Sequence, residues 1–430
     1  MRLLADLLGP APERRLDPGF AARDDDRDVT GYPSPSGTRV SSSSAMSLST
    51  VWRCVDLISS TVGLAPASMV VVSRGRAYPQ FAPPAWMLSP DAAEPNVTIG
   101  DHFAEATLSM LLDGNFFTLV APSVADPRAL RVLDPRRVRV RGPNADEARD
   151  GIRGARYDVM DATGRVVATV GPDQMLHGWW MRLPGEPRGI APLEAMRRGF
   201  GGALAADEYA ARYFGQGASL SFGVEVPGSL SPEQRKDFSD QLHERHAGLS
   251  AAHAIGVLTQ GAKFVTGLAP SPEQSQMLQT RKFAVEDIAR VYGVPPGMVG
   301  SQEPGASSYA SAVEWRRQFR SDGVLKFTMR LERQYGRLLR VPASVTDPAA
   351  RAALLFDLDW VDRADMLSRF QAHAEAIKSG FMSPNEARRA EGLEAADGGD
   401  VLVMLQQMVP LPDLGKTKLT EPAAGQRPAA

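Results

Sequence analysis

The sequence has one cysteine, no long apolar run and no motif for binding nucleotide phosphates. Cys54 is the single cysteine among 430 residues, which excludes an intrachain disulfide and a cysteine-rich zinc site. We expect it to be a buried, inert thiol. No apolar run is long enough to span a bilayer, so we expect no membrane contact. The N-terminus begins like a signal peptide, but Asp6 and Pro10 interrupt its apolar core, and we expect a short amphipathic arm instead.

The chain also lacks an excess of basic residues. It carries 48 lysines and arginines against 50 aspartates and glutamates, a formal net charge of −2. Proteins that grip DNA usually show a basic excess, because neutralisation of phosphates drives the binding. This near-neutral charge therefore indicates a protein that either does not contact nucleic acid or allows nucleic acid to slide along it. The length and a hydrophobic content of 43% suffice for two or three packing units.

No set of side chains predicts an enzyme. A Walker-type loop is absent, so we expect no hydrolysis of ATP, no catalytic residues and no cofactor. Asp357 and Asp359 alternate along a possible strand and could ligate a metal, but helix capping is the favoured interpretation. His243 and His246 lie one helical turn apart and could bind zinc, but the charged residues between them favour a solvated face. We therefore expect no metal site.

His177 stands close to two tryptophans, Trp179 and Trp180. Such a group could be a catalytic base or a surface on which nucleic-acid bases stack. Because no serine or cysteine motif accompanies the histidine, we favour a packed aromatic cluster.

The N-terminal part predicts a mixed α+β region. Apolar residues at three-to-four spacing predict a helix over 48–62, capped by Ser47 and ended by Gly63 and Pro66, and a buried strand over 69–72. A second helix is expected from Asp101, as its cap, to residue 113. Strands that are mostly antiparallel should follow it. They are expected at 116–120, 130–133, 138–140 and in a hairpin over 157–170.

Helices dominate the rest of the chain. Pro192 opens a helix over 191–215 that is rich in alanine and glycine. A strand, a charged helix and a hairpin should follow it. Three helices begin with a Ser-Pro capping box, and their cap residues are Ser231, Ser271 and Ser383. A further helix is expected over 353–380.

The stretch 279–339 is the most informative part of the sequence. A helix stops at Gly293, because Val294 precedes two prolines and is biased away from helical angles. A polar loop follows over 300–307. A second long helix then runs over 308–339, with Gly323 as a possible kink. A long helix joined to another by a polar loop indicates a positioning device rather than a reactive pocket.

Four motifs stand in an order that resembles the portal proteins of tailed bacteriophages, in particular those of long-tailed phages. They are SLSTVWRCVDLISSTVGLAPASMVVV, LLDGNFFTLV, PRGIAPLEAMRRGFGG and EDIARVYGVPPGMVG, followed by a Ser-Tyr step and by FMSPNEARRAEGL. The resemblance covers residues 47–401, whereas the first forty and last twenty residues match nothing.

The resemblance implies an α+β portal fold. That fold has a mixed α+β wing, paired stem helices, a small α/β clip, a long wing helix and a helical crown. The implied parts are a flexible arm (1–46), wing (47–189), stem helices (190–217 and 271–293), clip (218–270), tunnel loop (294–307), long wing helix (308–340), crown (341–407) and disordered tail (408–430).

It also implies a function. A ring of identical subunits, twelve in the family, would sit at one capsid vertex of a virion or phage-like particle and would be assembled in the bacterial cytoplasm. Double-stranded DNA would enter and leave through the ring. The implied partners are the terminase large subunit, the major capsid protein and the head–tail adaptor. The source could be a phage, a prophage or a gene transfer agent.

Two sets of site residues follow from the resemblance. The tunnel loop beside the DNA would contain Val294, Pro295, Pro296, Gly300, Gln302, Glu303 and Ser307. The clip face that meets the motor and later the adaptor would contain Glu233, Arg235, Lys236, Asp240 and Glu244. Two alternatives remain at this point: another head–tail connector ring, or a metal-dependent hydrolase using Asp357 and Asp359.

Overall fold

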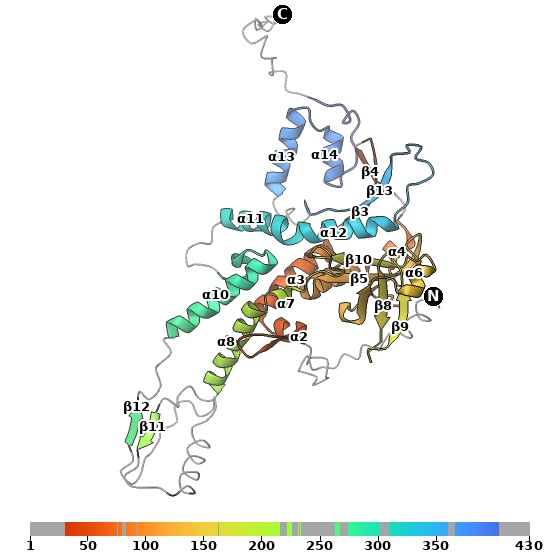
Figure 1. The fold of residues 1–430 in the computed structure, drawn as a ribbon. Coiled ribbons are helices and arrows are strands. Elements are labelled where there is room, and N and C mark those ends of the chain that lie inside the picture. The colour runs from red at the N-terminus through yellow and green to blue at the C-terminus, as the bar shows by residue number, and fades with distance from the viewer. Residues whose placement is uncertain are drawn as a thin grey trace, which may run out of the picture. The chain divides into compact units, whose positions relative to one another are not determined.

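The chain divides into two compact units, Met1–Leu358 and Asp359–Ala430 (Figure 1). The computed structural model describes residues 31–74, 76–79, 83–91, 93–161, 163–215, 222–225, 231, 233, 263–266, 274–301, 309–359 and 366–403. Within these ranges no helix is both long and apolar enough to cross a membrane.

The helices of the first unit range from single turns to five turns. They are α2 (Ser42–Met46), α3 (Ser49–Leu64), α4 (Ala85–Leu88), α5 (Ile99–Asp113), α6 (Ala145–Arg149), α7 (Pro192–Ala195), α8 (Arg197–Gly215), α10 (Gln274–Tyr292), α11 (Tyr309–Gln318) and α12 (Leu325–Tyr335). A π-helical segment, Phe319–Val324, joins α11 to α12 without a break in the helical backbone.

The strands form small antiparallel sheets. They are β1 (Tyr32–Pro33), β2 (Arg39–Val40), β3 (Ala67–Ser73), β4 (Arg76–Pro79), β5 (Asn115–Ser123), β6 (Asp126–Leu133), β7 (Val138–Arg141), β8 (Arg156–Met160), β9 (Val166–Val170), β10 (Met175–Trp179), β11 (Phe222–Glu225), β12 (Lys263–Thr266) and β13 (Arg351–Phe356). The strand orders are β10-β5-β6, β13-β3-β4, β7-β8-β9, β11-β12 and β1-β2.

The core of the first unit centres on Tyr335 at the end of α12. Its ring lies edge-on to Phe103 of α5 and stacks on Phe116 of β5, with centroids 5.1 and 6.1 Å away. Its hydroxyl lies 2.8 Å from His102 Nε2 and 2.9 Å from Thr118 Oγ1. These buried polar atoms satisfy one another. Helix α12 is thereby fixed to α5 and β5.

The second unit contains α13 (Met366–Lys378) and α14 (Pro384–Ala390). Ser383 caps α14 through the expected capping box, in which its hydroxyl accepts from the Glu386 N–H. Glu391 after α14 accepts hydrogen bonds from Arg369 Nη2 at 2.7 Å and from His373 Nε2 at 3.0 Å, both on α13. The two helices are therefore joined by a partly buried polar cluster.

The expected helix ends of the N-terminal part need correction. Leu48 precedes α3 as its N-cap residue without a side-chain bond, so the expectation that Ser47 caps this helix is wrong. Gly63 does not end α3 but lies within its last turn, where a Cβ would meet the Gly100 carbonyl oxygen at 2.8 Å. The residue is therefore a contact point between α3 and α5. Thr98 is the cap of α5, and Asp101 is the reciprocal partner of its capping box.

Tertiary contacts also overrule two helix predictions. The helix expected over 191–215 breaks at Met196 into α7 and α8. The start of the helix expected over 353–380 is instead strand β13, in which Leu354 pairs with Met69 of β3. The apolar run of β13 fits a buried strand as well as a helix, and only the pairing partner decides between them.

Candidate functional site

Helix α10 ends in a closed turn at Gly293. The Gly293 N–H donates to the Arg290 carbonyl at 3.3 Å, and the Val294 N–H donates to the Ala289 carbonyl at 3.0 Å. Gly293 has a left-handed φ of +75°. This pair of bonds is the Schellman motif, which glycine favours because a side chain is strained at positive φ. Val294 is buried, so the chain leaves α10 in a fixed direction.

The residues after the prolines fold back against α10. Pro296–Val299 form a 3₁₀ turn, and Gly300 ends it in the left-handed region with φ +86°. The Ser301 N–H donates to the Pro296 carbonyl at 3.0 Å. The Ser301 hydroxyl donates to Glu286 Oε1 on α10 at 3.2 Å. The segment 294–301, which we call the junction turn, is thus held at both ends.

Two glycines let the junction turn and α10 meet the long helix closely. A Cβ at Gly297 would lie 2.6 Å from the indole of Trp315 on α11, so this ring covers the junction turn. A Cβ at Gly293 would lie 2.8 Å from the carbonyl oxygen of Asp322 in the π-helical segment. The wider turn at Phe319–Val324 therefore packs directly against the end of α10.

Two cations on α12 bind the carbonyl groups at the ends of α10 and β10. Lys326 Nζ donates to the Tyr292 carbonyl at 3.3 Å and lies 4.7 Å from the centre of the Trp180 ring. It thus neutralises the carbonyl end of α10. Burial, together with the nearby charge of Arg330, lowers the pKa of the Lys326 ammonium to about 8.

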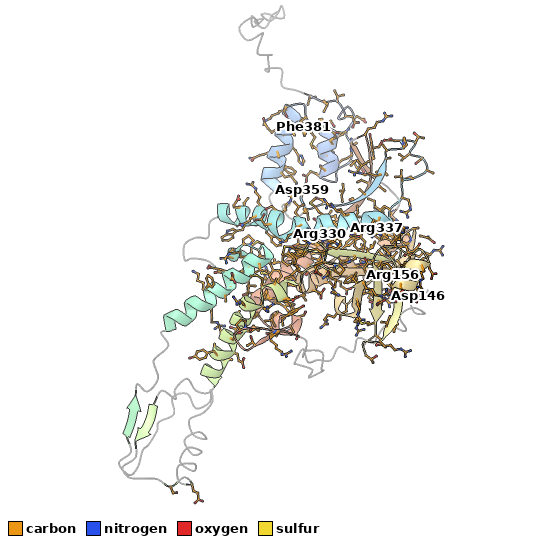
Figure 2. The ribbon with its side chains drawn as sticks, viewed as in Figure 1. Asp146, Arg156, Arg330, Arg337, Asp359 and Phe381 are labelled. Atoms are coloured by element: carbon orange, nitrogen blue, oxygen red, sulfur yellow. The ribbon has the colours of Figure 1, made fainter. Side chains whose placement is uncertain are left out.

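Arg330 is the second cation (labelled in Figure 2). Its guanidinium donates at 2.6 Å to each of three carbonyl oxygens, those of Trp179, Trp180 and Lys326. Trp179 ends β10, so Arg330 ties the sheet to the long helix.

This geometry holds no group of three His, Cys, Asp or Glu side chains that could bind a metal ion, as far as the described residues go. Asp357 lies just after β13, where its N–H donates to the Pro66 carbonyl at 2.8 Å. His243 and His246 fall outside the described residues. The arrangement is one of closely packed helices, a fixed turn and a loop that begins from it.

A model of the family described as "Phage portal protein" matches residues 49–392 of the chain. The chain belongs to the phage portal protein family. This portal protein is 31% identical over 372 residues to the probable portal protein of Streptomyces phage phiC31, covering 86% of the chain and 79% of that relative. It is 26% identical to the portal protein of Enterobacteria phage HK97, covering 87% of the chain and 85% of the relative.

Solved structures agree with the family. A chain in the virion of a native gene transfer agent particle matches with a TM-score of 0.54 at 23% identity, covering 82% of this portal protein and 92% of that chain. An HK97-family portal protein from Corynebacterium diphtheriae matches with a TM-score of 0.52 at 15% identity, covering 76% and 99%. The expected α+β portal fold is confirmed. So is the expected place in a phage or phage-like particle.

The site residues predicted for this portal protein fall into two groups. Val294 and Pro295 are buried at the start of the junction turn, whereas Pro296 and Gly300 are exposed. Gln302, Glu303 and Ser307 lie outside the described residues, so their position in a channel stays a prediction. The sequence reasoning missed the roles of Gly297, Trp315, Lys326 and Arg330.

In the predicted clip, Glu233 is exposed, and Arg235, Lys236, Asp240 and Glu244 lie outside the described residues. The expected strand over 221–226 is present as β11, which pairs with β12 from Glu225 opposite Lys263 to Phe222 opposite Thr266. The docking role of the clip stays a prediction.

The other candidates from the sequence are packed residues. Cys54 is fully buried, and burial raises the pKa of its thiol to about 12, so it is unreactive as expected. His177 is buried and stacks on Phe117 with centroids 4.3 Å apart. Its Nε2 lies 3.2 Å from Asn115 Oδ1. The prediction of a packed aromatic cluster is confirmed.

The buried histidines predict acid sensitivity. Burial lowers the pKa of His102 to about 4 and that of His177 to about 3, with Arg188 and Arg182 adding to the effect at His177. The unfolded chain therefore binds protons first as the pH falls, and stability that is fully present above the ordinary value near 6.5 is lost below it. Each histidine should cost about 2 kcal/mol of unfolding free energy between pH 7 and pH 5.

The substitution His177→Phe tests this expectation. It keeps the stacking on Phe117, and Asn115 Oδ1 still accepts the Gly189 N–H at 2.6 Å. Melting curves at pH 7 and pH 5 should show a smaller loss in the variant than in the natural protein. An equal loss in both proteins would mean that His177 does not contribute to acid sensitivity.

Proposed function

We propose that this portal protein forms a ring of twelve identical subunits, and that segment 302–308 of each subunit lines the channel for double-stranded DNA. A closed ring with head-to-tail contacts needs two different faces of one subunit to meet. Helix α8 offers one suitable face, because Gly202 is exposed and has open space beside it. Another subunit's helix could approach that face closely.

The observation that carries the proposal is the fixed junction on both sides of segment 302–308. On one side, Ser301 is bound to Glu286 of α10. On the other side, α11 begins at Tyr309 and its Trp315 covers Gly297. A loop whose two ends are held on packed helices can be presented at one defined place. That arrangement suits a constriction that must touch DNA repeatedly without gripping it.

The parts implied by the resemblance to the portal family complete the proposal. The wing would be residues 47–189, and α8 and α10 would be the paired stem helices. These two helices are joined by the ion pair between Arg281 Nη2 and Asp207 Oδ1 at 2.9 Å. We place the start of the crown at Asp359, because β13 belongs to the sheet of β3 and β4. The long wing helix is α11, the π-helical segment and α12.

The proposed partners follow from the same resemblance. The clip around Glu233, Arg235, Lys236, Asp240 and Glu244 would bind the terminase large subunit during packaging and the head–tail adaptor afterwards. The major capsid protein would surround the wing. The role is structural: the proposed ring guides DNA, and the motor supplies the energy.

Electron microscopy of the purified protein, with native mass to count subunits, tests the ring. The loop is tested by the double substitution Gln302→Lys and Glu303→Lys. New positive charges beside DNA phosphates should slow DNA movement several-fold or more while rings still assemble, because each added contact acts as a brake. The rate of DNA packaging into particles is the measurement.

A matched control adds positive charge at a distance from the loop. Asp146 on α6 has a side chain that is 87% exposed. Asp146→Lys should therefore leave the packaging rate unchanged. Normal packaging by the double variant, in particles that contain a normal ring, would contradict the assignment of 302–308 to the channel wall.

A further inference from the structure

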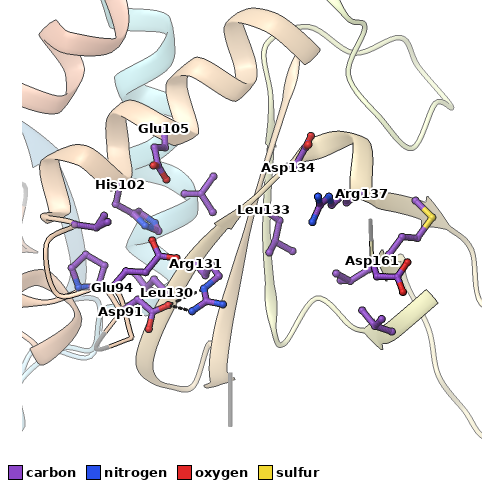
Figure 3. A pocket seen from close by; sticks show the side chains of 16 residues that line it. Asp91, Glu94, His102, Glu105, Leu130, Arg131, Leu133, Asp134, Arg137 and Asp161 are labelled. Carbon is purple, nitrogen blue, oxygen red and sulfur yellow. Dashed lines mark hydrogen bonds and ion pairs between the residues drawn. The ribbon is translucent and has the colours of Figure 1, made fainter. Parts of the chain in front are cut away.

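A groove of about 520 Å³ lies in the first unit between α5, strand β6 and the turn that joins β8 to β9 (Figure 3). His102 and Glu105 of α5 line one side, and Asp161 at the end of β8 lies on the other. Residues 130–133 of β6, together with Asp134 and Arg137 after it, form part of the wall of the groove. A groove of this size is typical of a binding site. It is separate from the junction turn.

The groove contains an open strand edge. Strand β6 is the last strand of its sheet. The Leu130 N–H points away from β5, because it donates to the Pro90 carbonyl at 2.7 Å. Since backbone groups alternate along a strand, the N–H and C=O of Val132 point the same way, into the groove. The edge therefore makes one hydrogen bond to the segment at Pro90 and offers the backbone groups of Val132 to another chain.

The wall of the groove is acidic. Five carboxylates line it against two guanidinium groups, those of Arg131 and Arg137. Arg131 and Asp91 neutralise each other, with Nη2 and Oδ2 2.6 Å apart and both side chains mostly buried. Asp134 is paired with Arg136, whose Nη2 lies 3.0 Å from its Oδ2. Carboxylates still outnumber cations along the wall, which favours a ligand with positive charge.

Exposed apolar residues border the same groove. Val167 of the edge strand β9 is 45% exposed and lines the groove. Leu130, Val132 and Val159 add apolar surface to the wall. Apolar side chains gathered in a groove beside an open strand edge are typical of a surface that another chain covers.

We propose that this groove binds an extended segment of another protein, in which lysine or arginine alternates with apolar residues. The backbone of the segment would pair with the β6 edge at Val132. Its apolar side chains would contact Val132, Val159 and Val167, and its cations would face Glu94 and Asp161. The proposed partner is a different protein and not a second portal subunit, so the proposal requires the groove to be open in the assembled ring.

The unique cysteine makes a direct test possible. Because Cys54 is fully buried, a thiol introduced by Val166→Cys, at an exposed position next to the groove-lining Val167, can be labelled selectively with an environment-sensitive dye. The probe is a six-residue Lys-Val repeat with blocked ends, titrated into the labelled protein at low and high salt. We expect saturable binding that is about tenfold tighter than for a Glu-Val repeat and that weakens with salt.

Two controls separate strand pairing from simple charge attraction. The Lys-Val peptide with an N-methyl group on every backbone nitrogen has no N–H donor on either edge, so it cannot form the strand ladder and should lose most of its affinity. Glu94→Lys should weaken binding about tenfold, whereas Asp146→Lys on α6 should not change it. Equal binding of the methylated peptide, or no preference for the basic peptide, would overturn the proposal.

Ring assembly gives a second, independent outcome. If the dye at position 166 reacts as readily in the assembled ring as in the dissociated subunit, this border of the groove is open to a partner protein. If ring formation blocks labelling, a neighbouring subunit covers the groove and the proposal is wrong. Neither outcome depends on whether segment 302–308 lines the DNA channel.

Discussion

Replacing Gly293 by alanine is expected to destabilise the protein by about 3 kcal/mol, a large effect for the addition of one methyl group. Two costs add at this position. The backbone has φ +75°, where an L-residue is strained. In addition, the new Cβ would lie 2.8 Å from the Asp322 carbonyl oxygen, so the end of α10 and the π-helical segment must move apart. Chemical unfolding of the full chain measures the loss.

Two other glycines separate these costs. Gly300 has φ +86° but open space around it, so Gly300→Ala should show only the backbone strain, about 1 kcal/mol. Gly202 lies in α8 with open space and no positive φ, so Gly202→Ala should be neutral or stabilising by up to about 1 kcal/mol. If Gly293→Ala and Gly300→Ala cost the same, the close contact with Asp322 contributes nothing.

The functional consequence of Gly293→Ala should appear at the junction turn. Because Gly297 lies against Trp315, displacement of the turn should expose the indole and shift its fluorescence to longer wavelength. A variant that still forms rings should then package DNA poorly, since segment 302–308 would start from a displaced turn. This part of the expectation rests on the proposed function, whereas the loss of stability does not.

The stop at Gly293 shows what local sequence can predict. Glycine followed by Val-Pro-Pro forbids continuation of the helix whatever the surroundings, so this end was predicted and is confirmed. The cap of α14 at Ser383 was predicted for the same reason, because its capping box involves only neighbouring residues. Gly114 likewise ends α5 with φ +80°.

Features that depend on distant partners were missed. Strand β13 exists because Leu354 finds Met69, a residue 285 positions earlier, and its apolar run alone fits a helix equally well. Gly63 reads as a helix stop, yet it lies inside α3 because Gly100 of α5 must approach it. The π-helical segment has no local signal beyond Gly323, and it lies where the end of α10 packs closely against Asp322.

The candidate site was predicted from the order of the motifs that resemble the family, and not from the chemistry of its side chains. The sequence identified the prolines and the polar loop, which carry the resemblance. It did not identify Lys326 and Arg330, because cations on an amphipathic helix normally face solvent. Only the fold brings them to the carbonyl ends of α10 and β10. The sequence alone does not show which helix or strand ends carry buried carbonyl groups that need a donor.

Arg330→Met is the second substitution with a large expected effect. Methionine has a similar apolar length but no donors, so the carbonyls of Trp179 and Trp180 would be left without the guanidinium. Hydrogen bonds to charged groups contribute roughly 1.5–3 kcal/mol each, and a buried acceptor left unpaired adds a cost. We expect a loss of about 3–5 kcal/mol in chemical unfolding of the full chain.

Two matched variants make the result specific to the forked contact. Arg330→Lys keeps the charge, but a single ammonium cannot reproduce the guanidinium fork, so it should recover less than half of the loss. Arg333→Met removes an exposed arginine from the same helix and should change stability by less than about 0.5 kcal/mol.

The location of the damage distinguishes this variant from a general loss of helix stability. Arg330 joins β10 to α12, whereas Tyr335 joins the same helix to α5 and β5 through His102 and Thr118. Loss of the guanidinium should therefore raise hydrogen exchange first at the Trp179–Trp180 backbone and later at α5. Unchanged exchange at these tryptophans, together with normal stability, would show that the carbonyl ends of β10 do not need Arg330. The tie between sheet and long helix would then have to be assigned to the Tyr335 cluster and to the contacts of Trp180 with Lys326 and Phe327.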